Sequence, residues 1–145
     1  MIEALESRIS PATFTGKILA YTDIDGDQVT IKFATKGSLS SSNFSFDTAF
    51  DSTGPQQLTH IVIDDAAFSG TSITMSVVQA GGGNGTADVG FINARGADLG
   101  QVKIIGDLGK IEAGDQDVAP GLAKLSVGSL GAKGLVTQGM AFRSW

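Results

Sequence analysis

The chain has 145 residues, a formal net charge of −5 and no Cys. This length fits one domain, or one small domain fused to a short repetitive one, and it suffices to bury a core without disulfides or metals. The lack of Cys excludes disulfides, thiolate nucleophiles and thiolate zinc sites. The ten basic residues are scattered singly, which argues against a nucleic-acid surface, and no segment is apolar over the roughly 18 residues that a membrane span requires.

The two halves of the sequence differ in composition. Fifteen of the 20 Gly residues lie from Gly81 onward, whereas the aromatic residues concentrate before Gly81. The run from Gly81 to Gly85 lacks the Lys and the following helix that an anion-binding loop needs, so we interpret it as a linker. We therefore expect a β domain over residues 1–80 and glycine-rich β repeats over residues 81–145, continuous with each other as one compact unit.

The first half predicts one helical turn followed by strands. Apolar residues at helical spacing favour a short helix over residues 1–11, which Pro11 ends. The strict alternation of apolar residues around Ile31 is typical of a half-buried strand, and the preceding Asp-Gly pair is typical of a hairpin turn. Alternation and β-branched residues predict strands over residues 13–22, 28–35, 44–46, 58–64 and 71–78.

The second half repeats a short theme of Leu, a small residue and a brief alternating strand that ends near Gly. The theme occupies residues 98–104, 107–114, 121–128 and 129–135. No such unit buries its own apolar face, which favours successive rungs of a β-solenoid, with Gly supplying the tight corners. Edge hairpins of a β-sandwich are the alternative, because short strands at this spacing are equally typical of that fold. The predicted fold class is thus all-β, with an antiparallel region followed by solenoid-like rungs.

Three segments resemble large, uncharacterised bacterial surface proteins that carry repeats. Leu-Glu-Ser-Arg-Ile-Ser-Pro-Ala at residues 5–12 is similar to their Leu-Glu-Ser-Arg-Ile-Ala-Pro-Ala segment, and residues 21–32 and 81–115 resemble their Tyr-Thr-Asp-x-Asp-Gly-Asp and glycine-rich Asp-Leu-Gly segments. The resemblance implies a surface or secreted location and a β-rich repeat architecture, and it implies no activity. Those proteins continue with further repeats, whereas this sequence ends at an apolar, aromatic terminus, residues 140–145, that we expect a neighbour to cover.

One motif has metal-ligand character. Asp23, Asp25 and Asp27 flank a Gly turn, and carboxylates at alternate positions can converge on Ca²⁺, which prefers six to eight oxygen ligands. Ala34 stands where the helix-loop-helix calcium motif has its Glu, so Ca²⁺ would need backbone carbonyls or an Asp from another loop. The alternative, which we favour, is an Asp-Gly hairpin turn with solvated acids.

No catalytic centre is predicted. Asp64 and Asp65 are sequence neighbours and point to opposite sides of a strand, so they do not converge by themselves. Asp115 and Asp117 are interpreted as turn residues, and His60, the single His, as a strand residue. We therefore expect a protein that is not an enzyme.

These observations together predict a non-catalytic structural or adhesive module at the bacterial cell surface or outside the cell. An open solenoid end exposes unpaired backbone groups and an apolar cross-section, so we expect a homo-oligomer or a filament neighbour as partner. A surface polysaccharide is a further candidate partner, whereas nucleic acid and a membrane span are not expected. The alternatives are a calcium-dependent carbohydrate-binding module and a β-solenoid enzyme that acts on polysaccharides.

Overall fold

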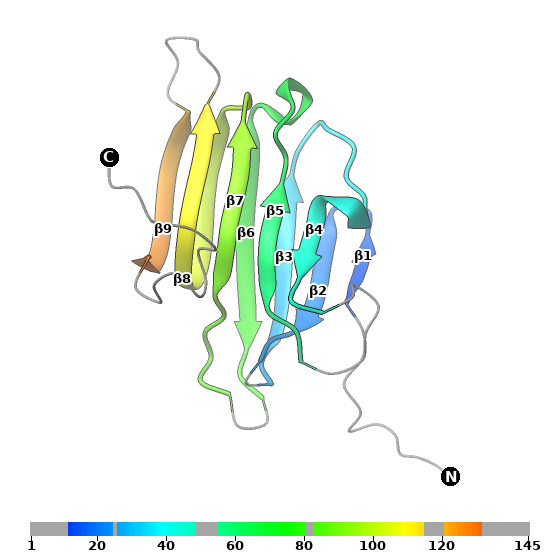
Figure 1. Ribbon diagram of the computed structural model, residues 1–145, viewed down its shortest axis with the longest axis vertical. Coiled ribbons are helices and arrows are strands. Elements are labelled where there is room, and N and C mark those ends of the chain that lie inside the picture. The colour runs from blue at the N-terminus through cyan, green and yellow to red at the C-terminus, as the bar shows by residue number, and fades with distance from the viewer. Residues whose placement is uncertain (1–11, 25, 49–54, 81–82, 115–120, 132–145) are drawn as a thin grey trace.

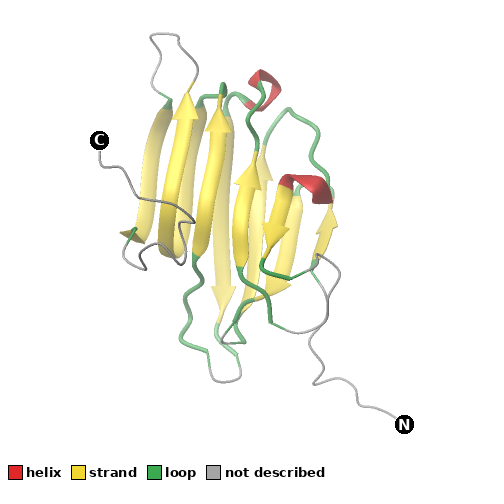
Figure 2. Cartoon of the chain, viewed as in Figure 1, coloured by secondary structure: helices red, strands yellow, loops and turns green. Residues whose placement is uncertain are grey.

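The computed structural model describes residues 12–24, 26–48, 55–80, 83–114 and 121–131, and these residues form an almost entirely β structure (Figure 1). The all-β prediction is confirmed. Figure 2 shows strands joined by turns, with two short 3₁₀ helices between them. In chain order the elements are β1 (Thr13–Thr15), β2 (Ile18–Thr22), β3 (Gln28–Ala34), η1 (Ser41–Asn43), β4 (Phe44–Phe46), β5 (Leu58–Val62), η2 (Ala66–Phe68), β6 (Thr71–Val78), β7 (Val89–Arg95), β8 (Leu99–Gly114) and β9 (Leu122–Leu130).

The antiparallel region predicted for the first half is confirmed, with β1, β2, β3 and β6 as consecutive neighbours. The single strand predicted over residues 13–22 is wrong, because the chain turns back within it and forms the β1–β2 hairpin. The hairpin predicted at the Asp-Gly pair joins β2 to β3. In β3, Val29, Ile31 and Phe33 are buried between more exposed residues, as expected of a strand with one face on the core. The helix predicted over residues 1–11 lies outside the described residues.

The long strand β8 connects two layers of the structure. Its first part, residues 99–103, pairs in parallel with β6, and its second part, residues 108–114, pairs in parallel with β7. Beyond β7 follow β5, also parallel, and the antiparallel β4. The hydrogen-bonded path of strands therefore folds over at β8, and the strands β4, β5 and β7 lie in front of β2, β3 and β6 in Figure 1. The last strand, β9, pairs in parallel with β8.

The repeated segments of the second half lie two to a strand, because residues 98–104 and 107–114 both fall within β8, which pairs in register with β9. Val89, Leu108 and Leu130 lie opposite one another on β7, β8 and β9. At the corner where β8 passes between the layers, a Cβ on Gly106 would lie 2.1 Å from the Ala87 carbonyl oxygen, and Gly106 has a φ of +156°. Only glycine fits this position, because any side chain would collide with backbone. Gly106 therefore forms a corner within β8, whereas glycine corners between rungs, and the choice between solenoid-like rungs and a sandwich, stay predictions.

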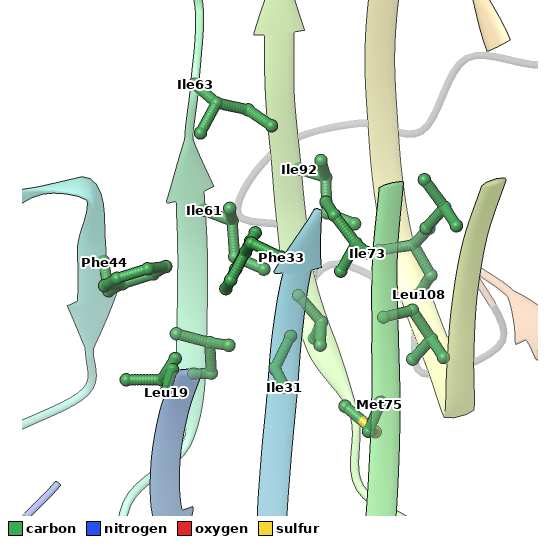
Figure 3. Close-up of a cluster of buried hydrophobic side chains, with 14 of the residues drawn as sticks. Leu19, Ile31, Phe33, Phe44, Ile61, Ile63, Ile73, Met75, Ile92 and Leu108 are labelled. Carbon is green, nitrogen blue, oxygen red and sulfur yellow. The ribbon is translucent and has the colours of Figure 1, made fainter. Parts of the chain in front are cut away.

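One hydrophobic core fills the space between the layers (Figure 3). Ile31 and Ile73 enter it from one layer, and Ile61 and Ile92 enter it from the other. The core takes residues from both sides of Gly81, and strands from both sides pair directly. The packing therefore makes the two predicted regions mutually dependent, because neither buries its apolar face alone.

Candidate functional site

The turn between β2 and β3 is held by its own backbone and by one carboxylate. Asp23 N donates to Asp27 O at 3.0 Å, and Gly26 N donates to Asp23 O at 3.1 Å. Asp23 Oδ1 accepts from Asp27 N at 2.8 Å. Asp23 is 5% and Asp27 is 0% exposed, so the interpretation of this turn as solvated acids is wrong for these two residues.

The buried carboxylate of Asp27 holds the loop that follows β6. Asp27 Oδ1 accepts from Ala80 N at 3.1 Å, and Oδ2 accepts from Gly85 N at 2.9 Å. A Cβ on Gly83 would lie 1.7 Å from Asp27 Oδ1, so a side chain at Gly83 would displace the carboxylate. The described part of the glycine-rich run that we interpreted as a linker is therefore a fixed loop, tied to the β2–β3 turn.

A polar pocket of about 220 Å³ lies beside this turn. Two of its acids come from different layers: Asp23 follows β2, and Asp88 immediately precedes β7. Gln57 supports the Asp88 side of the pocket, because Gln57 Nε2 donates to Asp88 O at 2.7 Å. The described lining consists of Asp23, Ile24, Gln57, Asn84, Thr86, Ala87 and Asp88.

Asp88 begins a row of polar residues on neighbouring strands. Asp107 N donates to Asp88 Oδ1 at 2.9 Å, and Ser129 Oγ donates to Asp107 Oδ1 at 2.7 Å. Asp107 and Ser129 lie opposite each other on β8 and β9. The stacked repeats thus place equivalent residues in one row, and each is hydrogen-bonded to the next.

Tyr21 on β2 carries a buried hydroxyl. It lies two residues before Asp23, is 4% exposed, and packs its ring edge-on against Phe46 at a centroid distance of 5.0 Å. Its hydroxyl has no hydrogen-bond partner among the described residues. Burial raises the pKa of Tyr21 well above its ordinary value, and the negative charges of Asp23 and Asp88 raise this pKa further. The phenol is therefore a protonated donor that meets no acceptor in the described part of the chain.

The three carboxylates predicted to bind Ca²⁺ do not share one role. Asp23 lines the pocket, Asp27 is bonded to the amides of the neighbouring loop, and Asp25 lies outside the described residues. Within the described ranges no group of three or more His, Cys, Asp and Glu side chains is arranged to hold a metal ion. The assignment of Ca²⁺ to Asp23, Asp25 and Asp27 stays a prediction.

The other acids and the His are placed by local structure. Asp65 caps the 3₁₀ helix η2, and its Oδ1 accepts from Ala67 N at 2.9 Å. His60 lies on β5, with its ring edge-on to Phe91 at 5.8 Å. Asp115 and Asp117 lie outside the described residues.

A second hollow, a groove of about 570 Å³, lies at the β9 end of the molecule. Its apolar lining includes Ile111, Leu122 and Leu125. Arg95 and Lys110 also line it, and both pair with Glu112, at 3.2 and 3.1 Å. The groove thus combines apolar side chains from β8 and β9 with a margin on which two cations share one carboxylate.

The opposite end of the core is closed by aromatic rings. Phe44 on β4 packs against Phe14 and Phe33 at centroid distances of 5.2 and 5.4 Å. The strands at that end, β1 and β4, have three residues each, whereas β9 has nine. Among the described strands, the longest outer edge of the sheet therefore lies at the β9 end.

Sequence reasoning missed Asp88, which the structure places in the pocket. The available signal was the Ala-Asp-Val-Gly segment at residues 87–90, which matches the Gly-Asp-Leu-Gly segment at residues 106–109. Residues 87–90 lie outside the predicted repeats, and Val89 stands where those repeats have Leu. No pattern in the sequence indicates where the hydroxyl of Tyr21 points.

No protein family, curated protein or solved structure matches the chain. Among the described residues no helix is long and apolar enough to cross a membrane.

Proposed function

We propose that the chain is a non-catalytic structural module of the bacterial surface or exterior that binds a second copy of itself through the edge of β9. The observation that supports the association is the long strand β9, which pairs with β8 alone among the described strands. Surface placement is supported by the resemblance to large bacterial surface proteins and agrees with the absence of Cys.

The backbone of β9 indicates which groups are available at its outer edge. Leu99 N donates to Gly121 O, and Gly131 N donates to Leu108 O, both at 2.8 Å. Backbone groups of successive residues in a strand point to alternate sides, so odd-numbered residues of β9 face β8. Ser126 therefore directs its N–H and C=O away from β8, and its side chain is exposed.

The lengths of the edges favour a dimer over a filament. A filament would pair β9 with a different edge of the next copy, and the edges at the other end, β1 and β4, have three residues each. Two copies of β9, with nine residues each, match in length. Pairing β9 with β9 around a two-fold axis uses the same surface twice and closes the assembly.

Light scattering coupled to size exclusion tests this proposal on the full chain. We expect a species of twice the 14.8 kDa chain mass at high concentration, which dissociates on dilution. Ser126→Pro removes one outward N–H without removing a bond to β8, and it should give a monomer. Ser126→Ala keeps the N–H and is the matched control, which should remain dimeric.

Three outcomes would count against the proposal. A wild-type chain that stays monomeric up to millimolar concentration excludes the association. Dimers that persist in Ser126→Pro, with the variant folded as judged by circular dichroism, exclude β9 as the interface. Open-ended polymers in place of dimers exclude the two-fold arrangement.

A further inference from the structure

At the β9 end, one layer of the structure extends one strand further than the other. Residues 122–127 of β9 pair with residues 99–104 of β8 and so add a strand to the layer of β6. In the layer of β7, the second part of β8 is the last long strand of the described residues. Beside it, the described pairing with β9 covers only Ser129 and Leu130. The described part of the chain therefore ends in a step between the layers.

The groove of about 570 Å³ lies at this step. Ile111 and Ala113 line it from the layer of β7, and Leu122 and Leu125 line it from the layer of β6. All four side chains belong to the hydrophobic core or pack against it. The groove is therefore continuous with the core, and an apolar side chain placed in it would remove water from core residues.

The described chain ends hydrogen-bonded to β8, directly before the groove. Gly131 N donates to Leu108 O at 2.8 Å, and a φ of +74° at Gly131 bends the chain there. The part of β8 that lines the groove, residues 110–113, begins two residues beyond Leu108. A strand advances about 3.3 Å per residue, so the residues after Gly131 can span the groove without a linker. Such a tethered segment competes with a separate molecule at an effective concentration of about 1 mM.

The register of β9 on β8 identifies the residues that would reach the groove. Leu108 lies opposite Leu130, and this register, carried on, places residues 132–136 opposite residues 110–114. Residues 110–114 lie in turn opposite residues 91–95 of β7. The stretch at 132–136 is thus the third member of a series whose first two members are neighbouring strands of one layer.

The side chains of this series suit the groove. Ala94 and Ala113 lie opposite each other, and Ala94 is 0% exposed; Leu135 is the next residue in that row. A larger side chain fits there because the groove lies beside this row, where no further described strand follows. Lys133 falls opposite Ile111, and its methylene stem can cover Ile111 while its ammonium group stays in water.

We propose that residues 132–136 form a strand beside residues 110–114 of β8, and that Leu135 fills the groove. The occupant is this chain's own segment, because it is tethered next to the groove and continues the series of β7 and β8. The pairing closes the open end of the core within one chain. It leaves the outer edge of β9 accessible, so the inference does not rest on the dimer proposed above.

Pairs of introduced cysteines test the position of the segment, since the chain has no Cys of its own. Glu112→Cys with Gly134→Cys places two thiols opposite each other on the proposed strands, and oxidised glutathione should join them within one chain. The matched control is Asn93→Cys with Gly134→Cys. Asn93 lies opposite Glu112 on β7, one strand further from the groove and beyond the roughly 7 Å that a disulfide spans. The control should give about tenfold less disulfide, as measured by mass spectrometry of tryptic peptides.

Thermal unfolding tests the burial of Leu135. Leu135→Ala should lower the Tm of the full chain by about 5 to 10 °C, because it empties part of the closed core. Val136→Ala is the matched control: Val136 is the next residue, and successive side chains of a strand point to opposite faces. It should lower the Tm by less than about 2 °C. Both variants are compared at one dilute protein concentration, so that dimerisation does not contribute.

The proposal is overturned if the Asn93 and Glu112 pairs form disulfides to the same extent, because the segment then has no fixed place beside β8. Disulfides between chains, in place of disulfides within one, also overturn it and assign the groove to a second copy. Equal Tm values for Leu135→Ala and Val136→Ala would show that Leu135 does not fill the groove. If Leu135→Ala does not fold, the cysteine pairs still decide the question, since they leave Leu135 in place.

Discussion

The two ends of the core are built on different physical principles. The end formed by β1 and β4 is antiparallel and is closed by large rings, with Phe44 in contact with Phe14 and Phe33. The end formed by β8 and β9 is parallel, and close backbone contacts at Gly106 shape its corner. The first end depends on side-chain volume, whereas the second depends on the absence of side chains. Substitutions should therefore act on the two ends by opposite mechanisms.

The largest loss of unfolding free energy is expected when a side chain is introduced at Gly106. Gly106→Val adds a β-branched group at a φ of +156°, with its Cβ 2.1 Å from the Ala87 carbonyl oxygen. Backbone strain and overpacking together should cost about 4 to 5 kcal/mol of unfolding free energy. Gly16→Ala is the control, because Gly16 also has a positive φ but nothing within 4 Å, and it should cost about 1 to 2 kcal/mol. Urea unfolding measures both, and equal losses would show that the corner is not tightly packed.

At the aromatic end, removal of one ring should lower the unfolding free energy nearly as much as a side chain at Gly106. Phe44→Ala deletes a side chain that is 5% exposed and touches two other rings, which should cost about 3 to 4 kcal/mol. Phe91→Ala on the outer face, where the ring meets His60 and Lys110, should cost about 1 kcal/mol. If the two variants have the same urea midpoint, Phe44 does not close the core.

Asp27 connects the β2–β3 turn to the glycine-rich loop, and loss of one of its carboxylate oxygens should lower the stability of the fold. Asp27→Asn places an amide where both carboxylate oxygens accept from Ala80 N and Gly85 N, so one buried donor loses its acceptor, at about 2 to 3 kcal/mol. Asp65→Asn at the exposed cap of η2 should change stability by less than about 0.5 kcal/mol, since Asn caps as well as Asp. Hydrogen exchange should show faster exchange of the Ala80 and Gly85 amides in Asp27→Asn, and unchanged rates would contradict the bonding.

The smallest change in stability at neutral pH is expected from Tyr21→Phe. The pKa of Tyr21 is raised mainly by burial, and further by the charges of Asp23 and Asp88. Below about pH 10 the folded and unfolded chains both keep the phenol protonated. Above this pH only the unfolded chain ionises readily, so stability should fall as pH rises, by up to about 1.4 kcal/mol per pH unit. Tyr21→Phe should remove this part of the slope and should leave stability at pH 7 equal or slightly higher, because it removes a buried hydroxyl that has no partner among the described residues.

Tyr21 is the single Tyr of the chain, so phenolate absorbance reports on it directly. Phenolate should appear together with unfolding as the pH is raised. A titration near pH 10 in the folded chain would show that the hydroxyl is exposed to solvent.

The sequence alone determined the all-β class, the β2–β3 hairpin and the strand at residues 71–78, which is β6 in full. These features are local: alternation of apolar residues fixes a strand, and an Asp-Gly pair fixes a turn. The repeated segments were also visible, but the strands with which they pair were not. The break within residues 13–22 was not visible, because strand-forming residues flank both sides of Gly16.

Only the tertiary structure decided which strands are neighbours and which polar groups meet. Asp23 and Asp88 are 65 positions apart in the numbering, and they share a pocket because β8 carries the hydrogen-bonded path from one layer to the other. Asp27 accepts from amides more than 50 residues away. The physical reason is that strand pairing and core packing are contacts of large sequence separation, whose partners are selected by the burial of the whole core rather than by any local pattern.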